Sequence, residues 1–371
     1  MQQRVWSFER HCDCVGLLAG SARVAVGQSS LEGNVWDGCV KLLDEASGAE
    51  LASKDMTCGV TSLCVAGNDD ALLAVARDDG QIHLLSLRSD DSTSRASLEL
   101  LALWSAHDNM VSRVVVDGAS GRCLSSSWDG GLSLWDFSRA QPDGSNAALW
   151  SCPAAHSGVA SDCTFAPTGT GMGGSEAVAA SVGRDGFLRL WDLRAESCSG
   201  ICDLRGAASC VAAWPQEPNS VVVGMEDGSV ALIDVRGGTG GGGGVAHEAL
   251  HQARVRRLLP VPSPRAGPCL WLSASDDATV LLSSLGGVGG GSRALVPAEH
   301  GDYVADLAAR PGAGGSLTVL SASTDKTLRL SLVAAALSHV RSRVTTRPAP
   351  PAKASRDAAK PALATGSPRR T

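Results

Sequence analysis

Short stretches of alternating apolar and polar residues recur along the chain, and an aspartate in a turn precedes each of them. The clearest two are Ser127–Asp136 and Gly183–Asp192, where an Asp-Gly pair is followed by a strand with two-residue alternation. Aligned on this turn, the series consists of Asp37, Asp79, Asp129, Asp185, Asp227, Asp277 and Asp325, and subtracting neighbouring positions gives steps of 42, 50, 56, 42, 50 and 48 residues. Each repeat therefore predicts a strand, a turn, a second strand, the Asp turn and a third strand. No long stretch has a period of 3.6 residues, so we expect very little helix.

Repeats of this length, built from short strands, are typical of the blades of a β-propeller. One blade cannot bury both faces of its sheet, whereas a closed ring buries them against the neighbouring blades. The sequence predicts an all-β fold, with a seven-bladed propeller over residues 1–336 and a disordered, basic, Pro- and Ala-rich tail over residues 337–371.

The two ends of the repeat series suggest how the ring closes. The last repeat ends near Val333 with its third strand, so one outer strand is missing. The segment Arg4–Phe8 has the alternation needed to supply it. Polar or Gly-rich insertions are expected as surface loops between blades, at Asp90–Ser97, Gln141–Ala147, Thr168–Ser175, Arg236–Val245 and Gly286–Ser292.

The charge is unevenly distributed along the chain. Residues 341–371 carry eight Lys or Arg against one acidic residue, a charge of +7, so with a total of −6 the remainder carries −6 − 7 = −13. An acidic body favours basic partners and disfavours nucleic acid, although a solvated surface also needs charge. No basic stripe with interleaved aromatic residues is present, so we expect no direct nucleic-acid binding.

Several absences in the sequence bear on the compartment. The N-terminal residues do not form a signal peptide, and no apolar run approaches the roughly 20 residues that span a bilayer. The chain has 12 cysteines, which are scattered through predicted strands as at Cys39, Cys64, Cys123, Cys163 and Cys210. Buried thiols in a reducing compartment account for them better than disulfides. We expect the protein in the cytoplasm and the nucleus, with no membrane association.

Two sets of residues resemble a hydrolase triad. They are His107, Asp129 and a serine at 125–127, and His156, Ser181 and Asp185. Because the pattern occurs twice in register with the repeats, we interpret it as a structural hydrogen-bond network, which consists of His107, Asp129, Trp135, His156, Asp185 and Trp191. No oxyanion-hole loop can be named, and we expect no enzymatic activity.

Metal and phosphate motifs are also weak. His247-Glu248-Ala249-Leu250-His251 matches the zinc-protease pattern, but the chemistry requires a helix, and a glycine run precedes this segment while a strand follows it. The Gly-rich segments lack the Gly-Lys-Ser/Thr ending of a phosphate-binding loop. We therefore expect no metal and no cofactor.

The repeats resemble those of the WD40 repeat family, and more narrowly those of methylosome WD-repeat subunits. The narrow resemblance rests on Gly27–Gly38, which contains the Ser-Ser-Leu-x-Gly-x-x-Trp pattern of that family's first blade. Supporting segments are Cys58–Leu63, Ala106–Ser112, Gly224–Asp234 and His300–Asp306. The resemblance covers about residues 22–333. The Trp-Asp pair itself stands only at 135–136 and 191–192, and the Gly-rich insertions and the basic tail depart from the family.

This resemblance implies a non-catalytic partner of the type II protein arginine methyltransferase, which makes symmetric dimethylarginine. It also implies that Arg/Gly-rich Sm proteins and histone tails are substrates that the propeller helps to present. The implied protein-binding residues are Leu31, Glu32, Asn34, Val35 and Trp36, with Trp36 inserted into a pocket of the enzyme.

Two alternatives remain open. Trp36 could simply pack in a turn, because Trp128 holds the same place in the third repeat. The protein could also be another WD40 adaptor, such as a chromatin-assembly or ubiquitin-ligase substrate receptor, since one propeller fold serves many functions.

Overall fold

The computed structural model describes most of the chain up to residue 334. The described residues are 3–18, 20–32, 35–66, 72–90, 95–117, 120–140, 148–166, 178–213, 220–235, 246–261, 270–284, 293–312 and 316–334. The tail predicted to be disordered, residues 337–371, lies outside them, as does the predicted domain boundary at residue 336.

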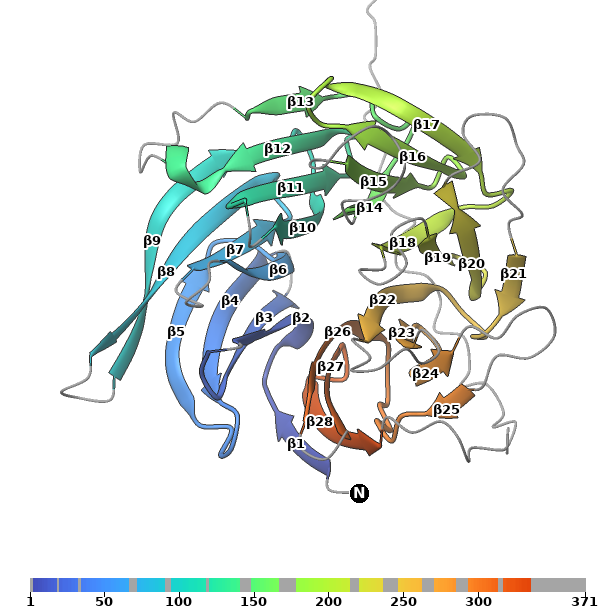
Figure 1. Cartoon of the computed structure of the whole chain (residues 1–371). Helices are drawn as coiled ribbons and strands as arrows, with labels where there is room; N and C mark the ends of the chain where they lie inside the picture. The colour runs from blue at the N-terminus through green and yellow to red at the C-terminus, as the bar shows by residue number, and fades with distance from the viewer. Residues whose placement is uncertain are drawn as a thin grey trace, which may run out of the picture.

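Seven four-stranded antiparallel sheets surround a central axis, and each sheet is one blade (Figure 1). From the axis outward, the first three blades consist of β2 (His11–Leu18), β3 (Arg23–Glu32), β4 (Val35–Asp44) and β5 (Glu50–Met56); β6 (Val60–Ala66), β7 (Leu72–Arg77), β8 (Gln81–Asp90) and β9 (Arg95–Ser105); and β10 (Val111–Asp117), β11 (Arg122–Ser127), β12 (Leu132–Asp136) and β13 (Trp150–Cys152).

The other four blades follow the same order around the ring. They consist of β14 (Ala160–Phe165), β15 (Val178–Gly183), β16 (Phe187–Asp192) and β17 (Ser197–Asp203); β18 (Ala208–Ala213), β19 (Ser220–Met225), β20 (Ser229–Asp234) and β21 (Ala246–Ala249); β22 (Val255–Val261), β23 (Leu270–Ser275), β24 (Val280–Ser284) and β25 (Arg293–Leu295); and β26 (Val304–Pro311), β27 (Ser316–Ser323), β28 (Thr327–Ala334) and β1 (Gln3–Ser7).

The prediction of an all-β, seven-bladed propeller is confirmed. Strands dominate the described part of the chain, in which η1 (Phe137–Arg139) is a 3-10 turn and no helix is long and apolar enough to cross a membrane. The blades pack face to face through their alternating apolar residues. One buried cluster, for example, joins Leu18 and Leu42 of the first blade to Leu63 and Val75 of the second.

The N-terminal strand closes the ring, as predicted. β1 pairs antiparallel with β28 of the last blade, with Val5 opposite Arg329 and Ser7 opposite Thr327. Trp6 and Phe8 then pack against a buried cluster that also contains Leu320 and Leu328. The last blade therefore consists of three strands from the end of the described chain and one from its beginning.

The prediction that the insertions separate the blades was wrong. Residues 91–94, 141–147, 236–245 and 285–292 separate the third strand of a blade from its fourth, and residues 167–177 separate the first strand from the second.

The prediction of three strands in each repeat was also wrong, because every blade has a fourth strand. Some fourth strands are very short, such as β13 and β25 with three residues each, and are half-exposed, so they show little alternation in the sequence. In the segment predicted as the loop Asp90–Ser97, Asp90 belongs to β8 and Arg95–Ser97 belong to β9, while residues 91–94 lie outside the described residues.

Every innermost strand has the same irregularity near its start. In each blade the register against the second strand shifts by one residue, which marks a β-bulge, and the bulged residues are Asp13, Thr61, Ser112, Ser161, Ser209, Arg256 and Ala305. Hydroxyl groups at these bulges connect neighbouring blades. Thr61 donates to the carbonyl of Val111 at 2.5 Å, and Ser112 donates to that of Ala160 at 2.6 Å.

Charged side chains follow these bulges in four blades and meet near the axis. Arg257 Nε lies 3.1 Å from Asp306 Oδ1, and Arg113 lies 3.7 Å from both Asp162 and Asp306. Both carboxylates also accept a backbone N–H from the next blade, Val211 N–H at 2.9 Å and Val15 N–H at 3.1 Å. Two arginines and two aspartates thus form a buried network in which charge is balanced across blades.

Candidate protein-binding site

The triad-like residues form buried networks that fix the Asp turns. In the third blade, His107 Nδ1 lies 3.2 Å from Asp129 Oδ2 and its Nε2 lies 2.9 Å from Ser125 Oγ, which also accepts the Trp135 indole N–H at 3.1 Å. Burial lowers the pKa of His107, which keeps the imidazole neutral, and because the Asp129 carboxylate can only accept, the single ring proton lies on Nδ1. Nε2 is then the acceptor, so the Ser125 hydroxyl donates to His107. Ser125 is fully buried, so this hydroxyl is not available to a substrate.

The fourth blade repeats the arrangement. His156 contacts Asp185 at 3.0 Å and Ser181 at 2.8 Å, and Trp191 donates to Ser181 at 2.9 Å. Burial lowers the pKa of His156, which keeps the imidazole neutral. Although burial alone would raise the pKa of Asp185, its hydrogen bond with His156 leaves that pKa lowered. A neutral histidine between an ionised aspartate and a buried serine is a structural clamp in this setting.

The sixth and seventh blades contain two further networks that were not predicted. His251 joins Asp277 at 3.0 Å and Ser273 at 2.8 Å, and His300 joins Asp325 at 3.1 Å and Ser321 at 2.7 Å. The signal in the sequence is a serine four residues before the turn aspartate, with a histidine about 20 residues earlier. Ser283 and Ser331 occupy the tryptophan position here, so these two networks have no indole N–H.

The same geometry accounts for the zinc-protease pattern. His247 lies on strand β21, whereas His251 follows that strand and has both ring nitrogens in hydrogen bonds with Asp277 and Ser273. Among the described residues, no three His, Cys, Asp or Glu side chains are grouped so that they could hold a metal ion. Every cysteine in the described part is a free thiol, and Cys39, Cys123, Cys163 and Cys210 are buried while Cys64 is half-buried.

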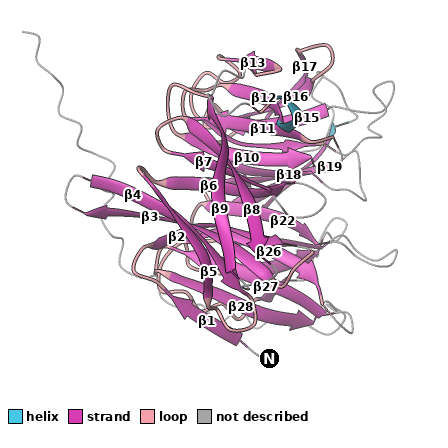
Figure 2. Ribbon diagram, turned by 90° about the vertical axis from the view of Figure 1, so that its left-hand side faces the viewer, coloured by secondary structure: helices cyan, strands magenta, loops and turns pink. Residues whose placement is uncertain are grey.

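Among the described residues, the first blade has the longest pairing between a second and a third strand. β3 and β4 have ten residues each, compared with six in β11 and five in β12, and they pair up to Glu32 and Val35. Figure 2 shows this hairpin extending beyond one face of the ring. The prediction that Asp37 lies in the repeated turn was wrong. Asp37 lies within β4 opposite Ser30, because the connection between the two strands is displaced to residues 33–34.

Trp36 is the exposed aromatic residue of this hairpin. It lies on β4 opposite Leu31, and 51% of its surface is exposed to solvent. Behind it, Asp37 accepts hydrogen bonds from Ser30 and Arg10, and these contacts hold the base of the hairpin against the ring. Of the other residues predicted to bind protein, Glu32 and Val35 pair at the end of the described hairpin, and Asn34 lies outside the described residues.

Trp128 occupies the place of Trp36 in the third repeat but has a different setting. It is 41% exposed, and the guanidinium of Arg184 lies 5.6 Å from the centre of its ring. Trp128 is therefore partly covered by the next blade, whereas Trp36 extends on its own hairpin. The two tryptophans are equivalent in sequence and distinct in surroundings.

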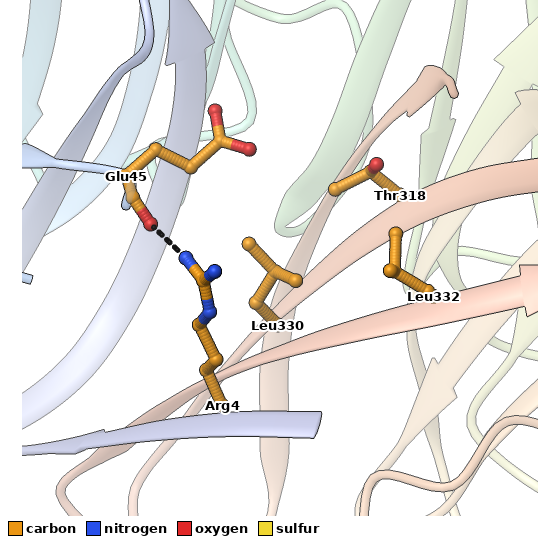
Figure 3. A pocket seen from close by; sticks show the side chains of 5 residues that line it. All are labelled: Arg4, Glu45, Thr318, Leu330 and Leu332. Carbon is orange, nitrogen blue, oxygen red and sulfur yellow. Dashed lines mark hydrogen bonds between the residues drawn. The ribbon is translucent and has the colours of Figure 1, made fainter. Parts of the chain in front are cut away.

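A cavity lies at the seam between the last blade and the first (Figure 3). Its lining includes Arg4 and Glu45 with two leucines of β28, and Arg4 donates to the Glu45 carbonyl at 3.2 Å. The volume is about 170 Å³, well below the roughly 300–1,000 Å³ of sites that hold drug-sized molecules. The cavity lies where β1 meets the first blade, and it is too small to indicate a substrate pocket.

Comparison with known proteins agrees with this architecture. The WD domain, G-beta repeat family matches residues 98–136, which run from the outer strand of the second blade through the first three strands of the third. A protein described as the ribosome biogenesis protein WDR12 homolog of Chlamydomonas reinhardtii is 26% identical over 264 residues, which are 70% of this chain. The match spans about half the length of that relative, 50%.

These comparisons support the WD40 repeat family and give no support to the narrower resemblance to methylosome subunits. The matched repeat coincides with a complete His–Ser–Asp–Trp network, which recurs in the fourth blade and, without the tryptophan, in the sixth and seventh blades. The protein is a seven-bladed β-propeller, and its third blade carries a repeat that matches the WD40 family.

Proposed function

We propose that this protein is a non-catalytic scaffold that binds other proteins, and that the β3–β4 hairpin with Trp36 is its principal docking element. The observation that carries the proposal is the half-exposed Trp36 on a hairpin longer than its counterparts in the other repeats. Tryptophans that become buried at the centre of an interface commonly contribute about 2–4 kcal/mol to binding. A paired strand also presents the indole with little conformational freedom to lose.

The first candidate partner is a type II protein arginine methyltransferase. The support comes from the Gly27–Gly38 segment, whose pattern resembles the first blade of methylosome subunits. In this role the acidic body, with its charge of −13 outside the tail, would attract Arg/Gly-rich Sm proteins or histone tails in the cytoplasm and nucleus.

The second candidate is a role in ribosome biogenesis. It is favoured by the match to the relative whose name carries that description, which covers 70% of this chain. The same hairpin would then bind a ribosome-assembly protein.

The test is a pull-down from cell extract with the wild type, Trp36→Ala and Ile201→Ala, with the recovered proteins identified by mass spectrometry. Ile201→Ala is the matched control because it removes an apolar side chain that is 48% exposed from β17, the outer strand of another blade. We expect a partner that the wild type and the control retain and that Trp36→Ala loses. An arginine methyltransferase in that set supports the first candidate, and ribosome-assembly proteins support the second. If every partner survives Trp36→Ala, the hairpin is not the docking element.

A further inference from the structure

A band of arginine and aromatic side chains crosses five blades on the face that carries the β3–β4 hairpin. We call it the rim arc, and its members are Trp128, Arg184, Glu226, Arg254, Arg256 and Tyr303. Trp128, Arg184 and Glu226 each directly precede a turn aspartate, and the other three lie at or just before the start of an innermost strand. All of these positions lie at the same end of their blades, so the side chains gather on one rim.

Contacts between blades make the arc continuous. Arg184 lies over the Trp128 ring and its Nε is 3.1 Å from Glu226 Oε1. The same carboxylate oxygen is 3.6 Å from Arg254 Nε. Further round, Arg256 Cζ lies 5.6 Å from the centre of the Tyr303 ring, and Arg256 also pairs with Asp276. The exposed rings of Trp128 and Tyr303 thus lie at the two ends of a row of guanidinium groups.

Positive charge in this row is incompletely neutralised. Arg184 and Arg254 share the carboxylate of Glu226, and Arg256 pairs with Asp276. The carboxyl of Asp13 is also close enough to interact with Arg256, but burial raises the pKa of Asp13 to about 7, so it neutralises Arg256 only in part. Arg254 Nε is buried and donates no hydrogen bond, because Glu226 lies beyond hydrogen-bond distance. Burial lowers the pKa of Arg254, and the nearby charge of Arg256 lowers it further. A further carboxylate against the exposed part of the Arg254 side chain would supply counter-charge to this row.

We propose that the rim arc is a second docking surface, and that it binds an acidic, extended segment of a partner protein. A carboxylate of the segment lies between Arg184 and Arg256 and pairs with Arg254, while its apolar or aromatic side chains pack on Trp128 and Tyr303. This surface is separate from Trp36 and adds to the scaffold function a site of opposite charge preference.

The surroundings favour a peptide over a nucleic acid. A phosphate backbone would place many charges against an acidic body, whereas an acidic peptide needs only one or two carboxylates within the arc. The aromatic ends also suit side chains that alternate with the acidic residues of an extended strand.

The test begins with selection of a displayed random-peptide library on the full-length protein. Selected peptides are synthesised with a fluorescent label, and their binding is measured by fluorescence polarisation. We expect peptides rich in Asp or Glu, with a Kd that rises with salt and rises at least about tenfold in Arg254→Gln. Because the Arg254 side chain is mostly buried, Arg184→Gln, in an exposed position, is measured alongside and should also weaken binding.

Two control variants show whether the loss of binding is specific to the rim arc. Arg293→Gln removes the same charge from the outer strand β25, where Arg293 pairs with Glu248, and should leave peptide binding unchanged. Trp36→Ala should also bind the acidic peptides normally, even where it loses the hairpin partner. Three outcomes would overturn the proposal. The selected peptides could be basic or purely apolar, or the protein could prefer single-stranded RNA to the peptides. Acidic peptides could also bind Arg184→Gln and Arg254→Gln as tightly as they bind the wild type.

Discussion

A single serine hydroxyl holds together two buried polar side chains in each complete network. Ser125 Oγ donates to His107 and accepts from Trp135, and the indole N–H and the imidazole nitrogen have no access to bulk water at this depth. Removing the hydroxyl leaves both groups unpaired, which costs far more than the hydrogen bonds contribute in net terms.

We therefore expect Ser125→Ala to lower the free energy of unfolding by about 2–4 kcal/mol. Urea unfolding followed by tryptophan fluorescence measures this. Ser105→Ala, on the exposed end of β9, is the control and should change the value by less than about 0.5 kcal/mol. Equal effects of the two substitutions would mean that the network is not a stabilising element.

Protonation of His83 should make stability depend on pH. Burial, and then the charge of Arg77, lower the pKa of His83 to about 4, whereas an unfolded histidine titrates near pH ~6.5. Between these values the unfolded chain binds a proton that the folded chain does not, so acid favours unfolding. The contribution of His83 is complete above pH ~6.5 and is lost as the pH falls to about 4.

The measurement is urea unfolding of the wild type and His83→Gln at several pH values. Glutamine retains an acceptor for Arg77 but does not titrate. The stability of the wild type relative to this variant should fall as the pH drops through that window. A difference that stays constant would show that His83 titrates normally in the folded protein.

At the scale of elements, the sequence predicted the strands that recur with a clear pattern and missed the bulges and short strands that lack one. The second and third strands were found because buried alternation and the Asp turn recur together. The bulges were missed because no single residue type marks them: the bulged residues range from aspartate and serine to arginine and alanine. The shift of Asp37 into a strand could not be seen, because the extra hairpin length depends on pairing at residues 31–36 and not on the turn pattern.

The role of β1 as an added strand leads to a deletion test. Removing residues 1–9 uncovers the edge of β28 and removes Trp6 and Phe8 from a buried cluster. We expect unfolding to be easier by at least about 3 kcal/mol, measured by urea denaturation. Val5→Thr, at a position that is 47% exposed, should change stability by less than about 0.5 kcal/mol. Full stability of the truncated chain would show that the ring does not need this strand.

At the scale of the whole molecule, the axial network joins residues that are distant in the chain. Arg113 meets Asp162 of the next blade and also Asp306 of the last blade, and only the closed ring brings Arg113 to Asp306. Composition and repeats predicted the ring, but no local pattern could show which inner positions face one another. For the same reason the rim arc was not predicted, although Trp128 is recognisable in the sequence as the equivalent of Trp36.

Neutralising one member of the axial network should destabilise the entire propeller. Asp306→Asn keeps an acceptor for the Val15 N–H but leaves Arg257 and Arg113 short of a buried counter-charge. We expect a loss of about 3–5 kcal/mol, measured as one cooperative urea transition. Glu99→Gln, which breaks an exposed pair with Arg88 at 3.9 Å, should cost less than about 0.5 kcal/mol. A small effect of Asp306→Asn would mean that the axial charges are solvated.

The pairing of β1 with β28 also sets an order of events during synthesis on the ribosome. Ser7 must wait for Thr327, about 320 residues later, and at roughly 5–20 residues per second that delay is about 15–65 s. Throughout it the nascent chain is an open crescent, with the β2 side of its first blade uncovered and its growing end exposed. Cotranslational folding can complete six blades, but the seventh forms only after the strand from the start of the chain returns. Chaperone capture or mispairing between neighbouring polysomal chains would act in that interval.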